Sequence, residues 1–162
     1  MIRPFSTVFT LALLLPLAAA PAAAGDEASW PWFRGPHGTG AAVEPLPAGT
    51  GALGLELAWK RPLGSGYSGI SVAGDTLVTA FQAGQSDVVA AFAAATGEER
   101  WRAELGPTYA GHDGSHDGPM ATPAIADGRV FMVGARGEVV ALELATGREL
   151  WRSDLVEELG CE

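Results

Sequence analysis

The stretch Ala141-Leu-Glu-Leu-Ala-Thr-Gly-Arg-Glu-Leu-Trp151 decides the fold, because it repeats a segment found 50 residues earlier. The earlier copy is Ala91-Phe-Ala-Ala-Ala-Thr-Gly-Glu-Glu-Arg-Trp101, and a partial third echo is Trp59-Lys-Arg-Pro-Leu63. Repeats with a period of this size are typical of solenoids and propellers, in which each unit buries its apolar surface against the next unit. The sequence therefore predicts a repeat architecture.

Each repeat contains four short β-prone segments that are separated by turn residues such as Gly74-Asp75 and Thr96-Gly97. The predicted strands are 68–73, 76–81, 87–93 and 98–104 in the first unit, and 122–126, 129–134, 138–144 and 148–154 in the second. Four such strands form an antiparallel meander, and meanders that stack face to face around an axis form a propeller. We expect an all-β fold, a partial β-propeller of two four-stranded antiparallel blades (67–105 and 120–155) with one N-terminal closing strand (55–63).

The recurring tryptophans have a structural interpretation. Trp101 and Trp151 follow a Thr-Gly turn and fall on the outer strand of each unit, where an indole can wedge against the adjacent sheet. Replacing either with alanine is expected to cost about 3–5 kcal/mol of stability. The alternative, that these indoles stack on a ligand, fits poorly with their regular repetition.

The N-terminal residues are typical of an export signal. Arg3 supplies a positive charge, Val8 to Leu17 form an apolar core, and Ala22-Ala23-Ala24 offers a cleavage site. Proline and small residues interrupt the run of about 20 apolar residues that a membrane helix needs. We therefore expect a signal peptide at 1–24 and a periplasmic or secreted protein without a membrane span after cleavage; an uncleaved anchor is the alternative.

The remaining chain divides into a Gly/Pro-rich strap at 25–54 and the repeat domain at 55–162. The aromatic run from Trp30 to Phe33 predicts that the strap packs against the domain. A formal net charge of −9 disfavours nucleic acid as a partner, because phosphate neutralisation needs clustered Lys and Arg. Cys161 is the single cysteine, so the chain forms no internal disulfide and depends on packing for stability.

One polar cluster is a weak candidate for a metal site. His112, Asp113, His116 and Asp117 lie within six residues, and imidazole and carboxylate groups are metal ligands. The alternative is a polar loop between blades in which glycines supply the turns. Because structural zinc sites usually need four ligands and no second cluster is evident, we expect no bound metal here.

The repeat resembles the tryptophan-docking pattern of the PQQ-like β-propeller repeats in the quinoprotein alcohol dehydrogenase-like superfamily. The matching positions are Ala91, Gly97 and Trp101 in the first copy, Ala141, Gly147 and Trp151 in the second, and Trp59 in the partial echo. The chain departs from the pattern at its acidic position, which is Ala93 in the first copy and Glu143 in the second. The segments 118–131 and 30–36 are also similar to segments of that family.

The resemblance implies a longer parent protein, since such propellers usually have about seven or eight blades. We therefore expect an N-terminal fragment whose first strand closes the ring. The alternative is a short protein that is completed by self-association.

The resemblance also suggests two functions. The first is an exported, non-catalytic scaffold or protein-binding module, similar to outer-membrane assembly propellers, with a protein partner and possible self-association through open blade faces. The second is a fragment of a PQQ-dependent alcohol dehydrogenase-like oxidoreductase that binds PQQ and calcium. Those enzymes carry paired cysteines, which this chain lacks, so the scaffold without a cofactor is the preferred hypothesis.

Overall fold

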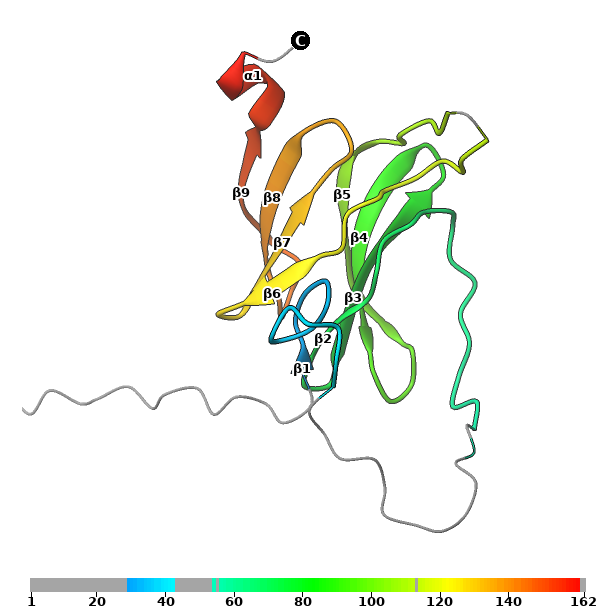
Figure 1. Ribbon diagram of the computed structural model, residues 1–162. Coiled ribbons are helices and arrows are strands. Elements are labelled where there is room, and N and C mark those ends of the chain that lie inside the picture. Colours follow the sequence, from blue (N-terminus) through cyan, green and yellow to red (C-terminus); the bar gives the residue numbers. More distant parts are fainter. Residues whose placement is uncertain (1–28, 43–53, 55, 113, 161–162) are drawn as a thin grey trace, which may run out of the picture.

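The computed structural model describes residues 29–42, 54, 56–112 and 114–160, so the predicted signal peptide and Cys161 lie outside the described residues. Two antiparallel sheets stand side by side (Figure 1). Sheet A has the strand order β1-β2-β3-β4-β5 and sheet B the order β6-β7-β8-β9. Both are meanders in which chain neighbours pair, and they form a partial β-propeller, as the sequence predicts.

The strands of sheet A are β1 Ser29–Trp30, β2 Ser71–Ala73, β3 Thr76–Ala83, β4 Ser86–Ala93 and β5 Glu99–Pro107. Those of sheet B are β6 Ala124–Ala126, β7 Arg129–Val133, β8 Glu138–Glu143 and β9 Glu149–Asp154. All eight strands expected within the two repeats are present, with shorter first strands than expected. A short helix, α1 Leu155–Leu159, follows β9, with Asp154 as its N-cap and Gly160 as its C-cap.

The N-terminal segment at 55–63, expected to close the ring, pairs with no strand among the described residues. Residues 56–63 are extended but belong to neither sheet. A strand needs a neighbouring backbone, and Pro62 also removes a hydrogen-bond donor. The Trp59 side chain, rather than backbone hydrogen bonds, attaches this segment to sheet A.

The sequence interpretation missed β1, which lies inside the predicted strap. Ser29 and Trp30 pair antiparallel with Ala73 and Val72 of β2. The next carbonyl, that of Pro31, accepts a hydrogen bond of 2.7 Å from the Ile125 amide in β6. The strap therefore ties together the first strands of both repeats, beside which it lies in Figure 1.

The main core lies between the two sheets. Sheet A contributes Val78, Ala80, Val89, Ala91, Trp101 and Leu105, and sheet B contributes Ile125, Val130, Met132, Val140 and Leu142. A second cluster, Phe81, Val88, Ala90 and Phe92, occupies the opposite face of sheet A. Within the part of the chain that the structure describes, no helix is long and apolar enough to cross a membrane.

Candidate functional site

Two tryptophans lie against turn glycines in the same geometry. The Trp101 indole packs on Gly147, where an added β-carbon would lie 2.6 Å from the ring, and its Nε1 donates to the Leu144 carbonyl at 2.8 Å. Trp59 packs on Gly97, where the corresponding distance is 2.5 Å, and its Nε1 donates to the Ala94 carbonyl at 2.8 Å.

Only glycine fits these two turns. Gly97 and Gly147 have φ angles of 69° and 71°, which L side chains rarely adopt, and the indole fills the space that a β-carbon would need. In each case the accepting carbonyl belongs to the third residue before the glycine. A turn of this shape is therefore a receptor for one indole ring and its N–H group.

Trp151 has no such receptor among the described residues. It pairs with Ala141 as Trp101 pairs with Ala91, so the two tryptophans hold equivalent positions. However, Trp101 is 8% exposed and Trp151 is 46% exposed. The Trp151 ring packs beside Phe131, with ring centroids 6.3 Å apart.

We use the name Trp151 face for the side of sheet B formed by Phe131, Val133, Val139, Ala141 and Trp151. The face of sheet A that is buried against sheet B carries the corresponding residues, because its strands have the same register. There Val78 pairs with Ala91 and Ala80 with Val89, as Phe131 pairs with Ala141 and Val133 with Val139. The corresponding residues differ in exposure: Ala80 is 4% exposed and Val133 is 44% exposed.

The acidic position of the repeat differs between the copies. In the second copy, Glu143 accepts hydrogen bonds from Thr146 and Arg148, which lower the pKa of its carboxyl group. Ala93 cannot do this in the first copy. The same turn is formed there by backbone bonds, with the Gly97 amide donating to the Ala93 carbonyl at 2.8 Å.

The loop that carries His112 and His116 forms hydrogen bonds within itself and with nearby tyrosines. The Tyr109 hydroxyl lies 3.0 Å from His112 Nδ1, and Asp117 accepts a bond of 2.9 Å from the Gly111 amide. The His116 amide donates to the Tyr67 hydroxyl at 2.9 Å. Asp113 lies outside the described residues. Among the residues that are described, no three His, Cys, Asp or Glu side chains converge on one point.

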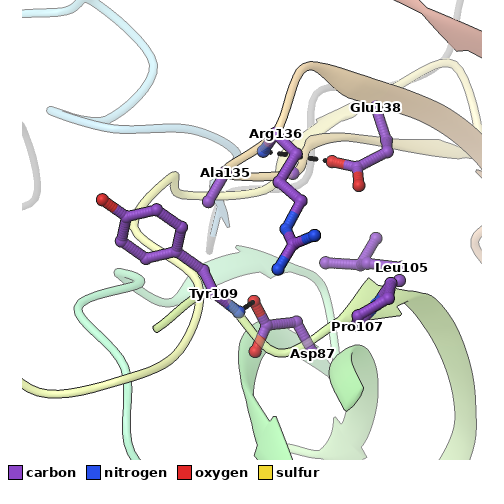
Figure 2. Close-up of a pocket in the computed structure, with 9 residues that line it drawn as sticks. Asp87, Leu105, Pro107, Tyr109, Ala135, Arg136 and Glu138 are labelled. Carbon is purple, nitrogen blue, oxygen red and sulfur yellow. Dashed lines mark hydrogen bonds between the residues drawn. The ribbon is translucent and has the colours of Figure 1, made fainter. Parts of the chain in front are cut away.

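The sequence interpretation also missed a polar pocket where the two sheets meet. Figure 2 shows Asp87 of β4 on one side, and Arg136 of the turn between β7 and β8 and Glu138 of β8 on the other. Asp87 is 4% exposed; one carboxylate oxygen accepts from the Tyr109 amide at 3.1 Å, and the other, Oδ1, has no hydrogen-bond partner. Burial raises the pKa of Asp87, against the opposing effect of the Tyr109 amide. The pocket holds only about 10 Å³, which is the space of one water molecule.

The pocket is too small for a substrate, so we interpret Asp87 as an interface residue between the sheets. No sequence signal distinguishes it from the other strand-flanking acids. Asp87 lies two residues before Val89 on β4, so strand alternation directs its side chain to the face that packs against sheet B.

Comparisons with known proteins find a family that part of the chain matches. The profile of a family described as "Outer membrane protein assembly factor BamB" matches residues 85–160. No curated protein sequence matches the chain.

Several solved structures are similar to the chain. BamB from Moraxella catarrhalis is 23% identical, with a TM-score of 0.39 over 56% of this chain and 23% of that one. A quinohemoprotein alcohol dehydrogenase from Comamonas testosteroni is 23% identical, with a TM-score of 0.45 over 63% of this chain and 15% of that one. A europium-containing methanol dehydrogenase is 22% identical, with a TM-score of 0.43 over 61% of this chain and 18% of that one. The chain thus spans less than a quarter of the length of each.

The matched residues 85–160 include β4, β5, the whole of sheet B and helix α1. They also contain both copies of the Thr-Gly turn and the two tryptophans that follow these turns. Residues 85–160 therefore match the PQQ-like β-propeller repeat family.

Proposed function

We propose that the chain is an exported, non-catalytic scaffold that binds another protein, and that the Trp151 face is its binding surface. The observation that carries this proposal is the exposure of an apolar sheet face whose counterpart in the first repeat is buried. Trp151 and Val133 on this face are 46% and 44% exposed. Contiguous apolar surface of this kind marks sites of protein association.

The chemistry of the face suits a protein rather than a small molecule. A sheet face with one protruding indole offers area and a hydrogen-bond donor, which are features of interface centres. The family name refers to a protein of outer-membrane assembly, which agrees with a binding role and with residence in the periplasm. The predicted signal at 1–24 agrees with the same location.

The test compares two variants of the exported chain in a capture experiment from a cell-envelope extract. Trp151→Lys places a charge at the centre of the proposed surface, and we expect it to abolish capture of one defined protein, identified by mass spectrometry. Leu57→Lys is the matched control, because Leu57 is also apolar and exposed, at 78%, but lies outside the Trp151 face. Equal capture by both variants and the wild type would contradict the proposal.

The dehydrogenase-like alternative makes an opposite prediction. Adding PQQ and calcium to the purified chain should leave the absorbance spectrum equal to the sum of its components if the chain is a scaffold. A saturable spectral shift, with alcohol oxidation, would support the oxidoreductase instead.

A further inference from the structure

Each occupied receptor turn belongs to a larger receiving surface. Sheet B receives sheet A on the face that carries Val130, Met132, Val140 and Leu142. In β7 and β8, Val130 pairs with Leu142 and Met132 with Val140. Sheet A carries a face that matches this surface.

We use the name Phe92 face for the side of sheet A that carries Leu77, Thr79, Ala90 and Phe92. Leu77 pairs with Phe92 and Thr79 with Ala90, in the register of the receiving face of sheet B. The Gly97 turn stands beside this face as the Gly147 turn stands beside the receiving face of sheet B. The Phe92 face is therefore built to receive another sheet.

Residues 56–63 lie over the Phe92 face, where Thr79, Ala90 and Phe92 are 7%, 0% and 4% exposed. Trp59 fills the Gly97 turn, and the Arg61 guanidinium lies 5.7 Å from the centre of the Phe92 ring. A cleft of about 190 Å³ remains between this segment and the sheet, and Leu63 and Ile70 at its edge are 44% and 55% exposed. Because residues 56–63 form no backbone ladder with sheet A, their attachment to the sheet depends on one indole, its hydrogen bond and these side-chain contacts.

We propose that the Trp151 face of one copy docks on the Phe92 face of a second copy, with Trp151 replacing Trp59 in the Gly97 turn. This inference rests on the proposed function and names the partner of its surface. Among the described residues, Gly35, Gly97 and Gly147 each lie against an indole; Trp30 packs on Gly35 within the strap, and Trp101 fills Gly147 from within the core. Gly97 is therefore the turn that a second copy can reach.

Trp59 acts as a built-in competitor in this arrangement. It belongs to the same chain as the Gly97 turn, so its effective concentration there is on the order of millimolar, above that of a second copy in dilute solution. The contact between copies is head-to-tail, and such contacts lead to rings or filaments. Residues 56–63 thereby limit growth of the assembly.

The experiment is sedimentation velocity over a series of micromolar concentrations. We expect Trp59→Ala to strengthen association by roughly tenfold or more, because it removes the competitor. Trp59→Ala combined with Trp151→Ala should return the chain to the association state of the wild type. Leu57→Ala, on the same segment but with the indole in place, should behave as the wild type. Thermal melting confirms that each variant is folded.

A synthetic peptide of residues 54–64 supplies a second measurement that does not depend on a mutant's folding. We expect it to dissociate the Trp59→Ala assembly, whereas the same peptide with alanine in place of the tryptophan should have no effect. The inference would be overturned if the Trp59→Ala, Trp151→Ala double variant still associates more strongly than the wild type. It would also be overturned if the peptide does not dissociate the Trp59→Ala assembly. Such a result would leave the proposed function standing, because the capture experiment tests for any protein on the Trp151 face, whereas sedimentation tests only for a second copy.

Discussion

Trp101 and Trp151 show how the same residue at the same strand position acquires different roles. Both are paired with an alanine of the preceding strand, but 8% of Trp101 and 46% of Trp151 is exposed. Trp101 is enclosed because sheet B supplies the Gly147 turn and the Leu144 carbonyl. The stability that an indole provides is therefore set by the neighbouring sheet rather than by its own strand.

The first prediction at this scale compares Trp101→Ala with Trp151→Ala. Loss of the buried Trp101 ring should cost about 3–5 kcal/mol, because it leaves a cavity and an unpaired carbonyl. Loss of the half-exposed Trp151 should cost about 1 kcal/mol or less. Urea unfolding monitored by circular dichroism measures both values. Equal losses would show that the two indoles are equally enclosed in solution.

The second prediction concerns Asp87. Burial holds its pKa above the ordinary value of 3.8, so its ionisation destabilises the folded state progressively as the pH rises from 3.8 through the raised pKa. Asp87→Asn keeps an acceptor for the Tyr109 amide and removes the charge. We expect the variant to be more stable than the wild type by about 1 kcal/mol at neutral pH.

The stability difference between Asp87→Asn and the wild type should grow with pH across this window and level off above it. Denaturation at a series of pH values checks this. A difference that is the same at acidic and neutral pH would show that Asp87 does not titrate as its burial implies.

At the scale of elements, the strap joins the two repeats through β1. Gly35 has a φ of 73°, and a β-carbon there would lie 2.7 Å from the Trp30 ring. We predict that Gly35→Ala displaces Trp30, loosens β1 and accelerates hydrogen exchange of the Ile125 amide, which donates to Pro31. Amides of the β8 centre, such as Val140, should keep their protection. Unchanged exchange at Ile125 would contradict a connecting role for the strap.

The repeated strands could be predicted because their signals are local. Short runs of apolar, β-prone residues bounded by Gly-containing turns fix β3, β4, β7 and β8 within each repeat. β1 could not be predicted from its own residues, because Ser29 and Trp30 become a strand only by pairing with β2, about 40 residues away. The segment 56–63 has the alternation of a strand but no paired backbone, so its sequence pattern was misleading.

For the candidate surfaces, too, the sequence shows the local signals but not the contacts between distant segments. The sequence identified Trp59, Trp101 and Trp151 as equivalent, since their neighbours recur. It could not tell which of the three is exposed, because exposure depends on the presence of a receiving sheet. Asp87 was missed for a related reason, since its burial arises from contact between the sheets.

At the scale of the whole molecule, the two sheets stack in the same orientation, and the two faces of each sheet differ. Each sheet carries one face that offers an indole and one that holds a receptor turn, so units add in a single direction. This polarity explains why the Trp151 face and the Phe92 face are complementary rather than alike, and why association between copies is expected to be head-to-tail.

Buried indoles hold each sheet against its neighbour through packing and one hydrogen bond each. Hydrogen exchange of the indole N–H groups tests this most directly. In ¹H–¹⁵N spectra of the chain, the Nε1 protons of Trp59 and Trp101 should exchange slowly, because each is bonded to a carbonyl at 2.8 Å. The Nε1 proton of Trp151 should exchange much faster at low protein concentration. If the Trp101 proton exchanges as fast as that of Trp151, the Trp101 indole does not hold the two sheets together.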